Sequence, residues 1–440
     1  FMLSSQHARE QLHDARLAAT RDGTILGLDV RIVKDVGAYH AWAMIDPTNC
    51  VNHLPAHYRI PSVRAEGFSV VTNKVAASPY RGAGRPEAVF VMDRLMDVLA
   101  RRLDMDPAEL RLKNMIQPHE MPYRSGLTYR DGVPIVYDGG DYPLELRRAL
   151  ELADYGGWRK RQAGLKRQGR HVGLGISCYL EAGGIGWPCE GATVKVDDGG
   201  NVEVMIGVSS SGQGHETVFA QVCAEYLGAR FEDIRVRGGD TALLPYGFGT
   251  GASRVAVNTG NAVAQAAEAV RFKACRVAAR LLECDEKDIR IEEGKAFVAG
   301  APMKSFPLAA LAQAALRDRG LAALGGPGLW ETKFYYPPTV TWSSGVNVAV
   351  VEVDPETGKI TILKYVAVHD CGRQLNPTIV DGQLLGGFAQ GLGVALGECL
   401  VYDEAGQLLT GSLMDYPIPR GDDIPEFVTE HLHFPTDHNP

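Results

Sequence analysis

The hydrophobic pattern changes from the strand period to the helix period within one stretch, residues 201–228 (NVEVMIGVSSSGQGHETVFAQVCAEYLG). Apolar residues alternate with polar ones at 202–206, which predicts a strand. A serine- and glycine-rich run occupies 209–214, and from His215 the apolar spacing is helical. This order directs unpaired backbone N–H groups and the positive end of a helix dipole towards one point. The stretch therefore predicts either an anion-binding loop or a plain strand-to-helix turn.

A second glycine-rich loop precedes a predicted helix at 246–267 (YGFGTGASRVAVNTGNAVAQAA). Ser253 and Thr259 offer hydroxyl donors near the start of that helix. Taken alone, this segment is also compatible with a tight turn and a helix cap.

A third segment, 369–398, predicts a helix that is unusually rich in glycine. Each glycine weakens an isolated helix by roughly 1 kcal/mol relative to alanine. We therefore expect the helix to lie close against backbone or against a bulky ligand. Gln383 and Gln390 are seven residues apart, so they share one face and could bond to such a ligand. The glycines at helical spacing are Gly382, Gly386, Gly393 and Gly397.

The first part of the chain predicts strands and then helices. Residues 15–39 predict a hairpin and 61–77 a further strand region. The loop SPYRGAGRPE at 78–87 carries Arg81 and Arg85 around its glycines. It predicts either a binding loop or a solvated basic turn.

Helices are expected from Pro86, from Asp106 and over 143–169. Asp106 is the predicted N-cap of the second helix, with Glu109 closing a capping box. The third helix contains the basic run WRKRQAGLKRQGR. A solvated helix explains this run better than nucleic-acid binding, because it holds a single aromatic residue.

We predict an α+β fold with two large mixed domains, residues 1–155 and 156–440, each containing a sheet and helices. The chain is 45% hydrophobic and 22% charged, with a net charge of −8. Such a charge implies no general attraction to nucleic acid or anionic membranes. No apolar run was expected to approach the roughly 20 residues of a membrane span, and the N-terminus lacks the pattern of a secretory signal.

Several common catalytic classes lack their sequence signatures. The eight cysteines form no CxxC pair, which argues against a zinc ribbon or a common iron–sulfur pattern and favours a reducing cytoplasm. There is no GxxxxGK[ST], GxSxG or HExxH motif, and the glycines at 212–214 lack the rest of a dinucleotide-binding fingerprint. The residues alone predict a large cofactor-binding enzyme.

The sequence resembles the molybdopterin-binding large subunit of the xanthine oxidase family of molybdenum hydroxylases. This family includes aldehyde oxidoreductases, carbon monoxide dehydrogenases and N-heterocycle hydroxylases. The resemblance rests on blocks in the family's order: SPYRGAGRPEA at 78–88, GQGHET at 212–217, GTGASRVAVNTGNAV at 249–263, and DCGRQLNP with DGQLLGGFAQGLG at 370–393. It implies two domains that grip an elongated pterin cofactor at their interface.

The resemblance also implies roles for individual residues. The molybdopterin phosphate region would be bound by Gln213, Gly214 and His215. Along the pterin would lie Ala252, Ser253 and Arg254, and the third side would be lined by Cys371, Asn376 and Gln383. Arg81 would face the metal and the substrate as a catalytic residue. No protein side chain is expected to ligate the metal, and the usual bacterial cofactor is the cytosine dinucleotide form.

The family's reaction is hydroxylation with water as the oxygen source and a glutamate as base. Electrons leave through iron–sulfur and FAD centres, which we expect on partner subunits of a cytoplasmic hetero-oligomer, with a dimer of heterotrimers as a candidate arrangement. The glutamate segment is expected beyond Pro440 and a further glycine-rich loop before Phe1, so we interpret the chain as a fragment that is inactive alone. No nucleic-acid partner is expected.

Alternatives remain open on the sequence. The copper-binding loop of carbon monoxide dehydrogenases carries a cysteine where this chain has Gly82, which favours an aldehyde or N-heterocycle hydroxylase. A carbon monoxide dehydrogenase-like large subunit and a non-catalytic cofactor-binding or assembly module are the alternatives. A nucleotide hydrolase using loop 209–217 would lack the P-loop lysine.

Overall fold

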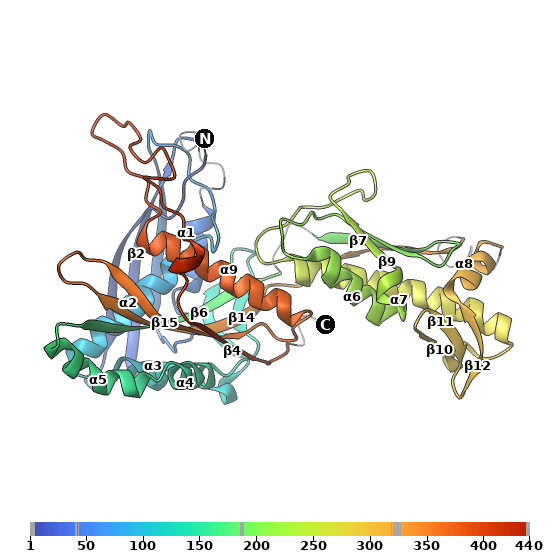
Figure 1. The fold of residues 1–440 in the computed structure, drawn as a ribbon, viewed down its shortest axis with the longest axis horizontal. Helices are drawn as coiled ribbons and strands as arrows, with labels where there is room; N and C mark the ends of the chain where they lie inside the picture. The colour runs from blue at the N-terminus through green and yellow to red at the C-terminus, as the bar shows by residue number, and fades with distance from the viewer. Residues whose placement is uncertain are drawn as a thin grey trace. The chain divides into compact units, whose positions relative to one another are not determined.

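The computed structural model describes residues 5–39, 42, 44–184, 189–317, 319 and 327–436, which divide into two compact units (Figure 1). The first unit takes the chain up to Glu181, then 342–373 and 381–436. The second takes 182–341 and 374–380. The chain thus leaves the first unit and returns to it. The predicted boundary of the cofactor-binding domains near residue 155 concerns a different division and stays a prediction.

Helices and strands are interspersed in both units, which confirms the predicted α+β class. The helices are α1 (Ile45–His53), α2 (Arg85–Leu103), α3 (Pro107–Asn114), α4 (Tyr142–Leu152), α5 (Tyr155–Arg167), α6 (His215–Leu227), α7 (Val255–Leu282), α8 (Leu308–Arg317) and α9 (Pro377–Leu396). The strands are β1 (Gln11–Ala19), β2 (Ile25–Gly37), β3 (Val63–Val71), β4 (Tyr123–Thr128), β5 (Pro134–Tyr137), β6 (His171–Gly183), β7 (Glu190–Val196), β8 (Val202–Ile206), β9 (Ile234–Gly238), β10 (Ile289–Glu292), β11 (Lys295–Val298), β12 (Ala301–Pro307), β13 (Leu329–Tyr335), β14 (Thr341–Val353), β15 (Ile360–Asp370) and β16 (Phe427–Leu432).

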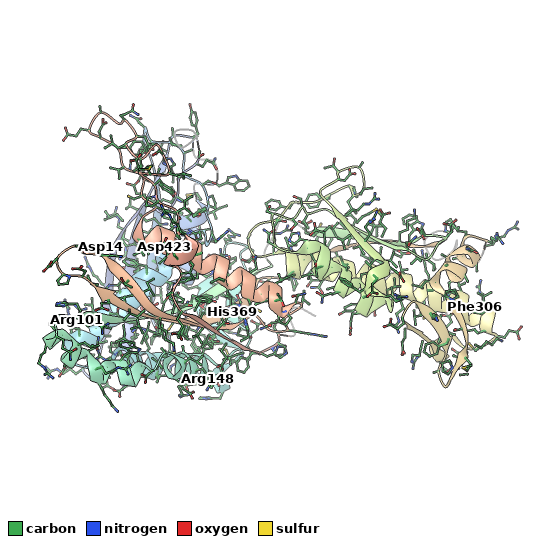
Figure 2. The ribbon with its side chains drawn as sticks, viewed as in Figure 1. Asp14, Arg101, Arg148, Phe306, His369 and Asp423 are labelled. Carbon is green, nitrogen blue, oxygen red and sulfur yellow. The ribbon has the colours of Figure 1, made fainter. Side chains whose placement is uncertain are left out.

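The first unit contains two main sheets. The predicted N-terminal hairpin forms β1 and β2, and β3 adds to β2 in parallel. The second sheet has the order β16-β15-β14-β6, in which β14 and β15 are antiparallel neighbours. Helix α4 contacts β15. Arg148, labelled in Figure 2, lies on α4. It donates two hydrogen bonds to the Glu430 carboxylate on β16, at 2.8 and 2.7 Å.

The second unit is built on a four-stranded sheet of order β13-β7-β8-β9. Helices α6 and α7 cover one face of it (Figure 1). Alanines occupy much of the buried side of α7, so this long helix packs closely against the strands. Strands β8 and β9 are parallel, with Val202 beside Ile234 and Ile206 beside Gly238. The loops that follow both strands therefore leave the sheet at the same edge.

The structure corrects three details of the sequence prediction. The helix expected over 143–169 is broken into α4 and α5, because Asp154 adopts a left-handed conformation at φ 52°. Asp106 caps α3 by accepting from Ala108 and Glu109 backbone N–H groups, but the capping box expected through the Glu109 side chain is not part of that cap.

The third correction concerns α9, which is long and apolar enough to cross a membrane by length and composition. The expectation that no apolar run approaches that length was wrong, because leucine, alanine and glycine outweigh the few polar residues in this helix. It is the one such helix among the residues the structure describes. Glycine-rich helices of soluble proteins can meet the same criterion. In the first unit, Asp381 bonds to His431 at 2.7 Å, and Phe388 packs on Tyr365 and Phe427.

Candidate functional site

The parallel strands β8 and β9 bring two predicted glycine-rich loops to one edge of the second unit. Loop 207–214 follows β8 and leads into α6, whereas loop 239–254 follows β9 and leads into α7. Each helix therefore starts at this edge with its first backbone N–H groups and the positive end of its dipole. The structure thus confirms that each of these glycine-rich loops precedes a helix, and it brings the two loops together at one edge of the sheet.

The two loops touch backbone to backbone. A Cβ atom on Gly247 would lie 2.1 Å from the carbonyl oxygen of Gly207, and one on Gly207 would lie 2.7 Å from that of Tyr246. The hydroxyl of Thr250 also donates to the carbonyl of Ser209 at 2.5 Å. No side chain fits between the loops, so both glycines are required by this close approach.

Loop 239–254 ends in residues with an unusual backbone conformation. Ala252 and Ser253 both have positive φ values, 57° and 51°. The Ser253 carbonyl accepts from the backbone N–H of Gly184 at 3.1 Å, which anchors the end of this loop next to the end of β6. Ser253 is followed by Arg254 in the right-handed region, at φ −110°. Adjacent residues of opposite backbone hand direct their N–H groups to the same side and form a nest that favours anions.

Arg254 is fully buried, and its side chain organises the loop. Its guanidinium forms an ion pair with Glu190, which is also fully buried. It also donates to the Cys189 carbonyl at 3.2 Å and to the Gly249 carbonyl at 3.3 Å. The Glu190 carboxylate accepts from the Phe248 backbone N–H at 3.1 Å as well. Arg254 and Glu190 therefore fix loop 246–254 from within the protein.

Asn376 adds the third predicted segment to the same unit. Its side-chain oxygen accepts from the Ile379 backbone N–H at 3.1 Å, so Asn376 caps the N-terminus of α9. Its amide nitrogen donates to Gln221 on α6 at 3.0 Å. In the first turn of α9, Ile379 packs on Gly214. A Cβ atom added to Gly214 would lie 2.6 Å from Cδ1 of Ile379.

Gln213 and His215 flank Gly214 at the start of α6. The Gln213 side-chain oxygen accepts from the Ser211 backbone N–H at 2.6 Å, which closes the serine-glycine turn and leaves the amide N–H₂ directed elsewhere. His215 is buried and packs against Phe219. Burial lowers its pKa, so the ring is neutral at pH 7. Its Nδ1 has no hydrogen-bond partner among the described residues.

Two buried polar side chains in the first turns of α7 also lack partners within the described part of the chain. They are Asn258 and Thr259, both fully shielded from solvent. Buried polar groups are nearly always hydrogen-bonded in folded proteins. Together with the nest, the helix termini and the close backbone approach, they fit an elongated anionic ligand that hydrogen-bonds along its length.

The first unit holds the other three predicted site residues. The exposed side chain of Arg81 donates through Nη1 to the Gly386 carbonyl on α9 at 3.1 Å. Gln383 lies exposed one turn earlier on the same helix. Cys371 follows β15 directly, in an exposed loop. Arg81 thus lies beside the middle of α9 within this unit.

The glycines of α9 have two different environments. Gly393 and Gly397 face close neighbours, since a Cβ atom would lie 1.9 Å from Oε1 of Glu398 and 2.7 Å from Cγ of Pro417, respectively. A Cβ atom on Gly382 or Gly386 would meet no described atom within 4 Å. Close packing therefore explains the glycines at the C-terminal end of the helix and not those beside Gln383.

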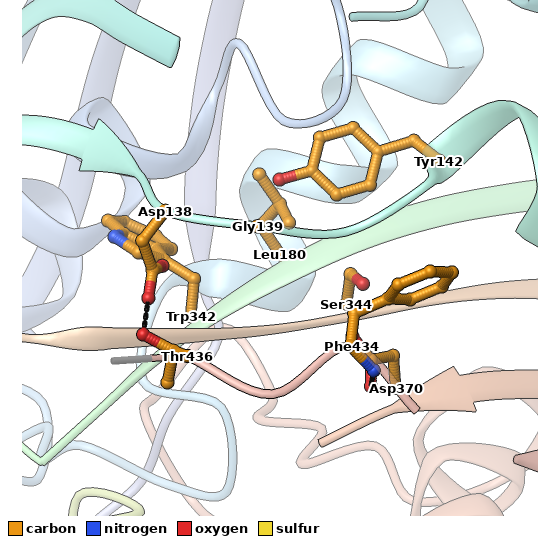
Figure 3. A pocket seen from close by; sticks show the side chains of 9 residues that line it. All are labelled: Asp138, Gly139, Tyr142, Leu180, Trp342, Ser344, Asp370, Phe434 and Thr436. Carbon is orange, nitrogen blue, oxygen red and sulfur yellow. Dashed lines mark hydrogen bonds between the residues drawn. The ribbon is translucent and has the colours of Figure 1, made fainter. Parts of the chain in front are cut away.

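A small cavity lies in the first unit near the end of β15 (Figure 3). It has room for about one water molecule and is lined by oxygen-bearing side chains that include Tyr142, Ser344 and Asp370. The Asp370 carboxylate accepts from the backbone N–H groups of Gly372 and Phe434, at 2.9 and 3.1 Å. Burial nevertheless raises its pKa to about 6. Asp370 thereby joins the Cys371 loop to the C-terminal segment.

Sequence reasoning missed Glu190, Gly207 and Gln221. Each contacts the predicted loops or site residues in space but lies far from its partner in the sequence. Glu190 lies 64 residues before Arg254, and no local pattern marks it as a partner. The Asn376-Pro377 dipeptide does indicate the start of α9 from sequence, because asparagine followed by proline is typical of a helix N-terminus. Among the described residues, no group of three or more His, Cys, Asp or Glu side chains could hold a metal ion.

Comparison with known proteins identifies the family. Residues 1–115 and 148–425 each match the molybdopterin cofactor-binding domain. The chain is 36% identical to the carbon monoxide dehydrogenase large chain of Hydrogenophaga pseudoflava, covering 98% of this chain and 55% of that protein. It is 37% identical to the nicotine 6-hydroxylase large subunit of Paenarthrobacter nicotinovorans, covering 99% and 54%.

Among solved structures, quinoline 2-oxidoreductase from Pseudomonas putida 86 superposes with a TM-score of 0.90 at 35% identity, covering all of this chain and 57% of that one. The chain thus spans about half the length of the relatives it matches. The family matches and the relatives confirm the resemblance found in the sequence. The chain belongs to the xanthine oxidase family of molybdenum hydroxylases, within its molybdopterin-binding large subunit.

Proposed function

We propose that this chain forms the molybdopterin-binding part of a molybdenum hydroxylase that oxidises an N-heterocycle or an aldehyde, with water as the source of oxygen. The observation that carries the proposal is the three-loop edge of the second unit, where loops 207–214 and 239–254 and Asn376 converge. Such an edge offers backbone donors to phosphate and pterin groups over an extended length.

Each group of residues has a distinct task in this proposal. Gln213, Gly214 and His215 would bind the phosphate arm of the cofactor, for which we propose the cytosine dinucleotide form. Ala252 and Ser253 would supply backbone N–H groups along the pterin, with Arg254 keeping them in place through Glu190.

In the first unit, Cys371 and Gln383 are further candidate cofactor-binding residues, and Arg81 would orient the substrate. The exposed guanidinium of Arg81 can donate several hydrogen bonds to a substrate heteroatom in addition to its bond to Gly386. When bound, the molybdenum cofactor would supply the redox chemistry, accepting two electrons as oxygen from water enters the product.

The shape of loop 78–87 favours hydroxylation over carbon monoxide oxidation. The copper version of this loop would need a cysteine at position 82. Gly82 has a φ of 95°, and a Cβ atom there would lie 2.4 Å from Cγ of Pro86. A cysteine would therefore strain this loop as it stands. Two similar proteins are named for N-heterocycle substrates, nicotine and quinoline, which supports the same class here.

Electron removal requires partners in this proposal. We infer that an iron–sulfur subunit and an FAD subunit accept the electrons, within a cytoplasmic hetero-oligomer for which a dimer of heterotrimers is a candidate. A relative is named as the gamma subunit of a 6-hydroxypseudooxynicotine dehydrogenase complex, which supports a multi-subunit assembly.

A non-catalytic cofactor-binding or assembly module is the second candidate, because the loops of the second unit would bind the cofactor in either role. Purification of the full-length subunit with its partner subunits separates the two. Molybdenum and pterin are quantified, and turnover with an artificial electron acceptor is assayed over quinoline, nicotine, aldehydes and carbon monoxide in ¹⁸O-labelled water. Label in a hydroxylated heterocycle or acid supports the hydroxylase. Bound cofactor without turnover of any of these favours the module, and absence of molybdenum and pterin contradicts both.

A further inference from the structure

The turn beside Arg81 has a strained backbone. Gly82, Ala83 and Gly84 all have positive φ values, 95°, 47° and 91°. Glycine adopts such angles freely, whereas for Ala83 the left-handed region costs about 1–2 kcal/mol of conformational free energy. Such conformations persist only where the surrounding structure holds them, and they cluster at functional sites. The contacts around residues 82–84 therefore show what keeps this turn in place.

Arg85 provides the first set of contacts. Its side chain is buried, in contrast to that of Arg81. Nη1 donates to the Gly82 carbonyl at 3.3 Å, and Nη2 donates to the Tyr129 hydroxyl at 3.2 Å. Nε lies 3.0 Å from the Glu181 carboxylate, which compensates the buried charge. A planar guanidinium has enough N–H donors to reach all these partners at once. A lysine ammonium cannot reproduce this planar arrangement of donors.

His53 completes the surroundings of Arg85. Arg85 Nε also donates to His53 Nε2 at 3.1 Å, and His53 Nδ1 lies 2.7 Å from the Asn49 carbonyl. An accepting Nε2 requires the proton of the neutral ring on Nδ1, which then donates to Asn49. Burial, reinforced by the nearby charge of Arg85, lowers the pKa of His53 well below its usual value, so the ring stays an acceptor.

Helix α1 holds the opposite side of the turn. The side-chain amide of Asn49 donates to the Ala83 carbonyl at 2.8 Å. Gly84 packs directly on the backbone of α1, where a Cβ atom would lie 2.1 Å from the Asp46 carbonyl oxygen. The turn is thus fixed from two sides, while the side chain of Arg81 projects from it and stays exposed.

We propose that Arg85 is a positioning residue, which together with Asn49 holds turn 82–84 in the conformation that presents Arg81 to the substrate. This inference rests on the proposed function of Arg81 as the substrate-orienting residue. Arg85 contributes no group to the substrate itself. Loss of its fork lets the turn relax towards ordinary backbone angles and displaces Arg81, and displacements on the order of 1 Å can lower turnover about 100-fold.

The test uses the complete enzyme with its partner subunits. Arg85→Lys is compared with Arg101→Lys, the same substitution at an exposed position of helix α2. We expect Arg85→Lys to lower kcat about 10- to 100-fold, with KM and molybdenum and pterin contents unchanged. Hydrogen exchange of the Ala83 and Arg85 amides, which bond to Tyr80 and Gly82, should accelerate, whereas exchange in the rest of α2 should not. Arg101→Lys should match the wild type in every measurement.

The outcomes separate this inference from the proposed function. Wild-type kcat in Arg85→Lys, or a loss of kcat in proportion to lost cofactor, overturns the positioning role and leaves the hydroxylase intact. If Arg85→Lys does not fold, Asn49→Ala is used instead, since it removes only the bond to Ala83. This variant should likewise lower kcat and leave KM unchanged. If the wild-type enzyme binds no molybdenum cofactor, the proposed function fails. Unchanged amide exchange in turn 82–84 then overturns the positioning role independently.

Discussion

The side-chain amide of Asn376 donates to Oε1 of Gln221 at 3.0 Å, while the side-chain oxygen of Asn376 caps helix α9. One residue therefore starts a helix and ties it to α6, whose N-terminus carries the proposed phosphate-binding residues. The contact is local to the second unit, and it can be tested by stability measurements alone.

Asn376→Ala should destabilise the protein by about 1–2 kcal/mol, because it removes both the cap and the bond to Gln221. Gln221→Ala removes only the second bond and should cost less, about 1 kcal/mol. Thermal unfolding of both variants and of the double variant measures the coupling. Equal effects of the two single variants would show that the cap contributes nothing.

Gly247→Ala should destabilise the second unit by about 1–3 kcal/mol or more, because the added Cβ atom would overlap the Gly207 carbonyl. Gly251→Ala in the same loop is the matched control, since no described atom lies within 4 Å of its added Cβ atom. Urea unfolding compares the two variants. Similar midpoints would rule out the backbone contact between the two loops.

Glu190→Gln should strongly reduce the free energy of unfolding, because it leaves the fully buried Arg254 without its counter-charge. Breaking one partner of a buried ion pair typically costs about 3–5 kcal/mol. The half-exposed pair of Arg237 and Glu203 provides the control, and Glu203→Gln should cost less than about 1 kcal/mol. Chemical denaturation measures both. A mild effect of Glu190→Gln would mean that water reaches Arg254.

Gln213→Ala should lower the pterin content of the purified enzyme several-fold while changing its stability by less than about 1 kcal/mol. The physical reason is that its amide N–H₂ is not used by the turn that its oxygen closes. Pterin fluorescence after oxidation and thermal unfolding are measured on the same samples. Gln168→Ala, in the exposed segment after α5, controls for the substitution. Full pterin content in Gln213→Ala would remove Gln213 from the proposed site.

His369 should make the protein less stable in acid. Burial and the neighbouring His431 lower its pKa to about 4 from 6.5. The unfolded chain therefore binds a proton below pH 6.5 that the folded protein accepts only near pH 4. Stability is thus lost as the pH falls between these values, by at most about 3 kcal/mol.

His369→Gln should remove that loss, so the variant gains stability relative to the wild type between pH 6.5 and 4. The raised pKa of Asp370, about 6, acts in the opposite direction as the pH falls below 6, which makes the wild-type profile shallow. Only the difference between variant and wild type isolates His369. Denaturation at pH 7 and pH 4.5 measures it, with the exposed His119→Gln as control. A difference independent of pH would contradict the lowered pKa.

Local patterns predicted much of the fold and part of the site. The change of period at residues 201–228 gave strand β8, its loop and helix α6, because amphipathic spacing is a local property of the chain. The second glycine-rich loop before α7 was expected for the same reason, whereas its contact with the first loop required the parallel pairing of β8 and β9. The break between α4 and α5 was not, because the left-handed Asp154 lies within an otherwise continuous helical pattern.

The remaining features depend on contacts between residues far apart in the sequence. Arg81 and Arg85 look alike in the loop SPYRGAGRPE, yet one is exposed and the other is buried among His53, Tyr129 and Glu181. Nothing in the local pattern separates them. The placement of the glycines in α9 likewise required the structure, since their spacing does not say which ones face a neighbour.

The route of the chain has a consequence for synthesis on the ribosome. Strands β6 and β14 are neighbours in one sheet, yet about 160 residues separate the end of one from the start of the other. At typical translation rates, β6 waits roughly 8–30 s before its partner strand emerges. During that time its edge is open to wrong pairing. Slow translation or an unstable second unit should therefore reduce the yield of folded protein even when every residue of the first unit is intact.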